Sequence, residues 1–132
     1  MKEFEVIDFH THPFIEQKSN ICGHKEYCNM SAESTVKTMK ELGVSKICGS
    51  VIGHGDILKN GGNQWDVIKA CNDEALKLRE MYGDFYVMGF HVHPDYVKKS
   101  CEEIEKMQKA VNIDYAPVTL DKSDKKVGLS FL

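Results

Sequence analysis

The sequence lacks the long apolar segment that an integral membrane protein needs. No run of apolar residues approaches the ~18 that a membrane-spanning helix requires. The first residues, Met1–Glu5, carry charges and lead directly into a strand-like segment, so we expect no signal peptide. These two absences predict a cytoplasmic protein that does not bind membranes.

The sequence also lacks an excess of positive charge. Its 17 lysine and arginine residues are outnumbered by 20 aspartates and glutamates, which gives a formal net charge of −3. This balance offers no electrostatic reason to expect nucleic acid as a partner. The content of 42% hydrophobic and 28% charged residues is typical of a folded globular protein. A chain of 132 residues is expected to form a single domain, residues 1–132.

Cysteine is present in an odd number, five residues in all. A disulfide framework is not expected in a chain without an export signal. Three cysteines lie in apolar patterns and are expected to be small buried side chains: Cys48, Cys71 and Cys101. Cys22, His24 and Cys28 have the residue types of a zinc clip. They offer only three ligands at an unusual spacing, so a lid loop with incidental cysteines is the preferred interpretation.

Strand-like and helical segments alternate along residues 1–110. Short segments rich in β-branched and aromatic residues predict buried strands at Phe4–Phe9, Lys46–Ile52 and Phe85–Phe90. Apolar residues three and four apart predict helices between and after them: one from a Ser31 cap to Leu42, one from Trp65 to Tyr82 that stops at Gly83, and one capped by Asp95. This alternation predicts an α/β fold with a parallel sheet. Ala110–Val118 is a possible fourth strand, and residues 111–132 otherwise form an irregular tail.

The loops that follow the predicted strands are long, whereas those that precede them are short. Pro13–Met30 and Gly53–Asn63 follow the first two strands. In a parallel α/β domain such loops emerge together at the carboxyl ends of the strands. Long loops in compact domains are usually functional, so this edge is expected to shape a pocket.

Two histidines stand at the end of the first predicted strand. His10 and His12 are one residue apart, so their side chains share a face, with Cα atoms ~6.6 Å apart. Both imidazoles can then bind one metal ion, and zinc takes nitrogen ligands at ~2.0–2.1 Å. Asp8 shares this face and could orient an imidazole through a hydrogen bond. The residues of opposite parity, Ile7 and Phe9, are expected to pack under the helices.

Two segments resemble a known family. "VIDFHTHPF" resembles the first-strand signature of the amidohydrolase superfamily, and "YGDFYVMGFHVHPDYVKKSCEEIEKM" resembles the third-strand region of its amidohydrolase-related branch. That branch includes decarboxylases of the aminocarboxymuconate semialdehyde type. The resemblance covers approximately Phe4–Met107. It implies a TIM-type (β/α)8 barrel that acts as a metal-dependent hydrolase or decarboxylase on a small-molecule substrate, with His10 and His12 as first-strand ligands of a divalent metal, expected to be zinc.

The barrel that this resemblance implies is truncated. A full barrel takes ~250 residues, and no histidine follows His93 to match the family's later-strand ligands. About three βα units and a possible fourth strand are present, so one copy is not expected to complete the site. The chain is then either an amino-terminal portion of such an enzyme or a non-catalytic α/β module. In both cases its open strand edges favour self-association or association with a missing barrel half.

A second pair, His91 and His93, stands at the end of the third predicted strand. That strand would lie ~9.6 Å from the first, so all four histidines could share one ion, as in a small phosphoesterase-type metalloenzyme. The resemblance implies instead that this pair lines the pocket. His54, between two glycines on the same edge, is a further candidate for lining the pocket.

Overall fold

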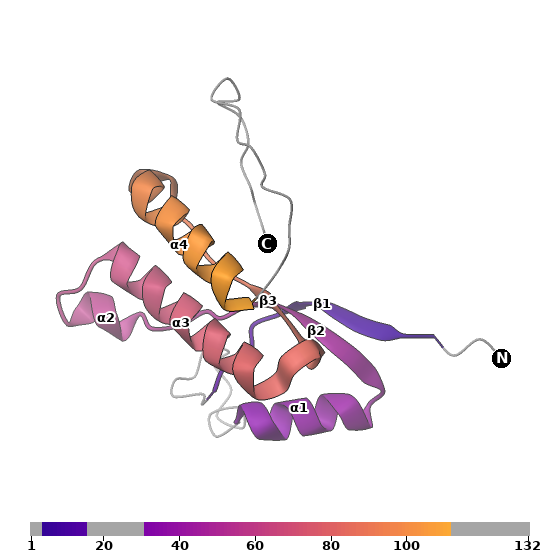
Figure 1. Ribbon diagram of the computed structural model, residues 1–132. Helices are drawn as coiled ribbons and strands as arrows, with labels where there is room; N and C mark the ends of the chain where they lie inside the picture. The colour runs from indigo at the N-terminus through magenta and orange to yellow at the C-terminus, as the bar shows by residue number, and fades with distance from the viewer. Residues whose placement is uncertain (1–3, 16–30, 112–132) are drawn as a thin grey trace. The chain divides into compact units, whose positions relative to one another are not determined.

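The computed structural model describes residues 4–15 and 31–111 of the chain (Figure 1). By its contacts the chain divides into two compact units, Met1–His91 and Val92–Leu132, where the sequence predicts one domain. The first unit contains the sheet and most of the residues that the sequence singles out. Among the described residues, no helix combines the length and the apolar character required to cross a membrane.

A three-stranded parallel sheet forms the centre of the first unit, with strands in the order β1-β2-β3. Its elements follow one another along the chain as β1 (Val6–Thr11), α1 (Ala32–Glu41), β2 (Val44–Ser50), α2 (Asp56–Lys59), α3 (Gln64–Tyr82), the short 3₁₀ helix η2 (Gly83–Phe85) and β3 (Tyr86–Gly89). The α/β class and the parallel sheet are therefore confirmed. Two of these elements have no counterpart among the predicted ones: the short helix α2, inside the second long loop, and η2.

The ends of the two long helices follow local signals. Ser31 caps α1, because its side chain accepts a hydrogen bond from the backbone N–H of Ser34, and the Ser34 side chain accepts one from the backbone N–H of Ser31. Asn63 caps α3 in the same way with Asp66. Gly83 ends α3 with φ of 53°, a conformation that favours glycine. The predicted cap at Ser31 and stop at Gly83 are both confirmed.

The core lies on one side of β2 and β3. Side chains from the two strands, such as Ile47 and Tyr86, meet Val36 of α1 and Leu78 of α3 in one cluster of buried residues. The same cluster contains Cys71. Because α1 and α3 contribute to one cluster, they cover the same face of the sheet.

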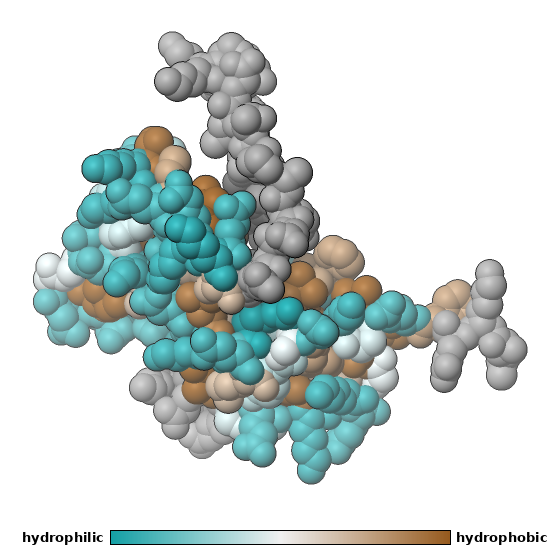
Figure 2. All heavy atoms as spheres, viewed as in Figure 1, coloured by the Kyte–Doolittle hydropathy of each residue, from teal (hydrophilic) through white to brown (hydrophobic). Residues whose placement is uncertain are grey.

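Strand β1 is covered less than the sequence predicts. Ile7 and Phe9 are 37% and 78% exposed, so the expectation that they pack under the helices is wrong. Two causes are visible. The helices α1 and α3 pack against β2 and β3, and shifts in the β1–β2 register break the regular alternation of side chains along β1. Figure 2 shows hydrophobic residues on the surface near this strand.

The cysteines differ in burial. Cys71 is buried as predicted, Cys48 is partly buried, and Cys101 is exposed, so the prediction of three buried thiols holds fully for Cys71 alone. Cys101 lies on α4 (Val97–Val111), where Ser100, Glu103 and Met107 occupy the buried positions instead. All three are free thiols.

The second unit contains η3 (Pro94–Tyr96) and α4 (Val97–Val111) among its described residues. His93 caps the start of η3, because its Nδ1 accepts a hydrogen bond from the backbone N–H of Asp95. The predicted cap at Asp95 is therefore wrong, because Pro94 already opens the first helical turn. Ala110 and Val111 belong to α4, and the rest of the predicted fourth strand lies outside the described residues.

Candidate metal site

The imidazoles of His10 and His12 converge at the carboxyl end of β1. Their Nε2 atoms are 3.3 Å apart, and the rings meet edge to face, with centroids 5.1 Å apart and planes at 84°. Both side chains are exposed, so an ion from solvent can reach them. Two nitrogens that each lie ~2.0–2.1 Å from a tetrahedral zinc ion are about 3.3–3.4 Å apart. The observed separation therefore matches one edge of a tetrahedral site.

A backbone carbonyl fixes the orientation of His12. Its Nδ1 lies 2.9 Å from the carbonyl oxygen of Ser50, at the end of β2. A carbonyl oxygen only accepts hydrogen bonds, so Nδ1 carries the proton and Nε2 of the neutral ring keeps its lone pair. A metal-binding histidine is usually held by such a bond from its second nitrogen. Without metal, Nε2–H of His10 can donate to this lone pair across the 3.3 Å gap.

Asp8 contacts the main chain of the histidine pair. Its Oδ1 accepts a hydrogen bond of 3.1 Å from the backbone N–H of His10, whereas the sequence suggests a bond to an imidazole. The bond lies beside the register shift that separates Asp8 from Thr11 in the β1–β2 ladder. Asp8 therefore supports the local path of the chain that presents His10.

Close approach of β1 and β2 also positions the pair. A Cβ atom placed on Gly49 would overlap the carbonyl group of Thr11, the residue between the two histidines. The Thr11 hydroxyl donates to the carbonyl of Cys48 at 3.3 Å. Because Gly49 has no side chain, the end of β1 can lie close enough to β2 for His12 to reach Ser50.

His91, at the end of β3, is held by three hydrogen bonds. Its ring Nε2 lies 2.8 Å from the carbonyl oxygen of Val51. Its backbone N–H donates to Oδ1 of Asn72 at 2.7 Å, and its carbonyl accepts from Nδ2 of the same side chain at 3.0 Å. Asn72 is fully buried on α3. Histidines that follow β1 and β3 thus both bind carbonyls at the end of β2.

His93 lies in the second unit and caps η3. Besides accepting a hydrogen bond from Asp95, its ring packs edge to face on Tyr96, with centroids 5.5 Å apart.

Among the residues that the structure describes, no three histidine, cysteine, aspartate or glutamate side chains are grouped so as to hold a metal. The alternative of one site shared by four histidines therefore gains no support. Cys22, His24 and Cys28 lie outside the described residues.

Glu74 of α3 joins the two loops at the carboxyl edge of the sheet. Its Oε1 accepts a hydrogen bond of 2.8 Å from the backbone N–H of Ile15, and its Oε2 lies 2.7 Å from Nε2 of His54. The side chain of His54 is 33% exposed and its backbone has φ of 57°. Glu74 is not among the residues that the sequence motifs single out. Its position was informative, because Glu74 lies three and four residues from Cys71 and Leu78 on the apolar stripe of α3.

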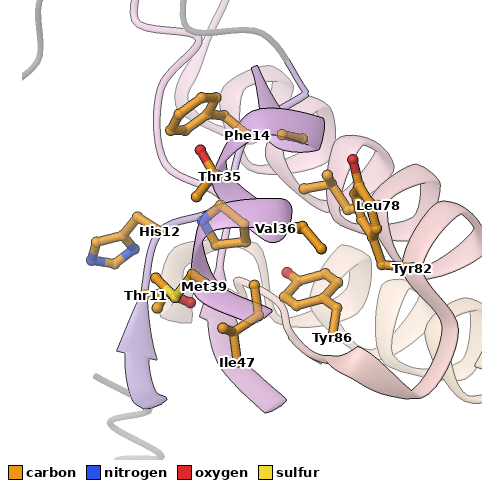
Figure 3. Close-up of a pocket in the computed structure, with 12 residues that line it drawn as sticks. Thr11, His12, Phe14, Thr35, Val36, Met39, Ile47, Leu78, Tyr82 and Tyr86 are labelled. Atoms are coloured by element: carbon orange, nitrogen blue, oxygen red, sulfur yellow. The ribbon is translucent and has the colours of Figure 1, made fainter. Parts of the chain in front are cut away.

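An apolar cavity of about 240 Å³ adjoins His12, one member of the histidine pair. Figure 3 shows His12 at one end of this cavity and Leu78 and Tyr82 at the other. Its wall consists of residues from the end of β1, from α1 and α3 and from the sheet: Thr11, His12, Pro13, Phe14, Ala32, Thr35, Val36, Met39, Ile47, Leu78, Tyr82 and Tyr86. The cavity gives an apolar group a place to bind next to the candidate metal ligands.

Burial raises the pKa of the Cys71 thiol to about 11, with a further contribution from the nearby Glu74 carboxylate. The unfolded thiol ionises near its ordinary value of 9.0, so burial of the neutral thiol stabilises the fold below pH 9 and this stabilisation is lost as pH rises through 11. We expect the free energy of unfolding to fall by about 1–2 kcal/mol over this range because of Cys71. Urea unfolding of the wild type and of Cys71→Val from pH 8 to 11 measures this fall in the free energy of unfolding. An equally steep fall in Cys71→Val would contradict the assignment.

Comparisons of the chain with protein-family models, with curated proteins and with solved structures find no match.

Proposed function

We propose that this chain binds a divalent metal ion, zinc in the first instance, through Nε2 of His10 and His12. The observation that carries this proposal is the 3.3 Å separation of the two Nε2 atoms. The bond from Nδ1 of His12 to Ser50 supports it further, because with the proton on Nδ1 the Nε2 of His12 has a lone pair with which to bind a metal. The donor set fits zinc as half of a site, because zinc takes four ligands and accepts histidine nitrogen.

We further propose that the chain is the amino-terminal portion of a metal-dependent hydrolase or decarboxylase of the amidohydrolase-related type. Its three parallel strands in consecutive order, joined by helices, would be the first βα units of a TIM-type barrel. A bound metal would supply an activated water or polarise a substrate carbonyl. The chain's own residues orient the ligands, through Ser50 and Asp8, and offer the apolar cavity for a small substrate. Because the described residues of one copy supply two ligands, the isolated chain is expected to have little activity.

A second candidate function is a non-catalytic α/β module that self-associates and at most binds metal. The exposure of apolar side chains along the edge strand β1, with Phe9 at 78%, favours it. A cytoplasmic location belongs to both proposals, since the free thiols Cys48, Cys71 and Cys101 suit a reducing compartment.

Calorimetric zinc titration of the full chain tests the metal site. We expect zinc to bind the wild type, and His10→Ala and His12→Ala each to weaken binding by more than the roughly 10–100-fold that loss of a ligand's hydrogen-bond partner costs, because each removes a nitrogen donor itself. His93→Asn is the matched control. It also removes one histidine, yet it keeps a side-chain acceptor for the backbone N–H of Asp95, so its affinity should equal that of the wild type.

Two results would count against this assignment. Wild-type protein that stays metal-free after zinc loading, by elemental analysis, would exclude the site. If His91→Ala abolished zinc binding as fully as His10→Ala does, both histidine pairs would take part, as in the phosphoesterase-type alternative.

A further inference from the structure

The described part of the chain supplies two ligands, whereas zinc takes four. Both imidazoles are exposed, so further ligands can approach from outside the molecule. This inference rests on the proposed metal site and asks what occupies the remaining positions around the ion.

The site lies on a strand that is itself open to a partner. β1 is at the edge of the three described strands, and its second side pairs with none of them. Apolar side chains at and before this edge are exposed, with Phe4 at 87%, Val6 at 50% and Phe9 at 78%. An edge strand with such side chains is a surface that proteins usually cover.

We propose that a second copy of this chain completes the site. One zinc ion would bind His10 and His12 of both copies and so hold together a symmetric dimer. In a tetrahedral site, the two ligands from one copy span one edge, and a twofold axis through the metal generates the opposite edge. The Nε2 separation of 3.3 Å has the length of such an edge, so the second copy supplies an equal one without a change in this distance. The proton that His10 carries on Nε2 in the absence of metal would move to its Nδ1, so that Nε2 can bind the ion. A twofold interface of this kind closes at the dimer.

The edge strand favours this occupant, and the metal ion offsets the repulsion between two copies. Each copy carries a formal net charge of −3, which opposes the approach of two copies. A divalent cation bound between neutral imidazoles reduces this repulsion where the two copies meet. The exposed side chains of Phe9 and its neighbours lie next to the histidines on the same strand, so bringing the two sites together also brings these apolar groups to a partner surface.

Zinc titration followed by light scattering coupled to size exclusion tests the proposal on the full chain. We expect the molar mass to rise from 15.0 kDa to twice that value. The change should be complete at about half an equivalent of zinc per chain, and chelation should reverse it. His10→Ala and His12→Ala should remain monomeric at the same zinc concentration, while His93→Asn should form the dimer like the wild type. Tetrahedral d–d absorption after replacement of zinc by Co²⁺ should appear with the dimer.

The alternatives give different results. One bound zinc per chain without a change in mass would overturn the dimer and leave the proposed metal site standing. A dimer that persists in chelator and in the His10→Ala/His12→Ala double variant would overturn the metal bridge and indicate association through apolar groups alone. Absence of both bound zinc and dimer would reject the proposed function as well.

Discussion

We expect Gly49→Ala to destabilise the protein by about 3 kcal/mol and, if the proposed metal site holds zinc, to weaken zinc binding together with it. The new methyl group would overlap the carbonyl group of Thr11 on the neighbouring strand. These are backbone atoms, which cannot rotate away as a flexible side chain would, so the end of β1 must move from β2. That movement lengthens the contact of His12 with Ser50, which orients the imidazole of His12 beside that of His10.

Urea unfolding and calorimetric zinc titration of the same samples measure both parts of this prediction. Gly55→Ala is the matched control, because a methyl group there meets nothing within 4 Å and the backbone has φ of −64°. Its stability should lie within about 0.5 kcal/mol of the wild type. A Gly49→Ala variant with unchanged stability would show that β1 is not packed as closely against β2 as described. Lost stability with wild-type zinc affinity would separate the metal site from the position of β1.

We expect Asn72→Ala to have the second large effect, lowering the free energy of unfolding by about 3–5 kcal/mol. The side chain of Asn72 is fully buried and forms one hydrogen bond with the backbone N–H of His91 and one with its carbonyl. Removing the side chain leaves a cavity. It also leaves the backbone N–H and the carbonyl of His91, just after β3, without these partners. Chemical unfolding measures the loss, and the exposed Lys69→Ala on the same helix, expected within about 0.5 kcal/mol, is the control.

Asn72→Asp separates the hydrogen bonds from the packing, because it preserves the volume of the side chain. An ionised carboxylate still accepts from the N–H of His91 but faces its carbonyl oxygen without a proton to donate. Burial raises the pKa of the introduced carboxyl, so part of the stability should return, relative to wild type, as pH falls and the carboxyl is protonated. A loss that is independent of pH would contradict the paired hydrogen bonds.

Local sequence patterns were enough to predict most of the elements. Residues spaced three and four apart mark α3, and Ser31 and Gly83 mark helix ends through hydrogen bonds and backbone angles that involve only neighbouring residues. The exposure of Phe9 could not be predicted in the same way. It depends on which strands the helices contact and on register shifts between β1 and β2, both of which are properties of the assembled sheet.

The candidate site also combines features that local sequence predicts with features that depend on the assembled fold. The spacing of His10 and His12 along one strand predicts that their rings lie on one side, and the rings do converge. The contact of His12 with Ser50, the bond of Asp8 to the main chain and the double contact of Glu74 each join residues whose proximity only the fold creates. A polar residue on an apolar helical stripe, such as Asn72 or Glu74, is the one such feature with a signal in the sequence.

The carbonyl oxygens of Ser50 and Val51 accept hydrogen bonds from the rings of His12 and His91, respectively. Every amino acid has a carbonyl group, so these anchors do not depend on which residues occupy positions 50 and 51. Substitutions that keep the strand intact can therefore accumulate there during evolution while the histidines stay in place. A signature assembled from side chains alone would record the histidines and omit the groups that orient them.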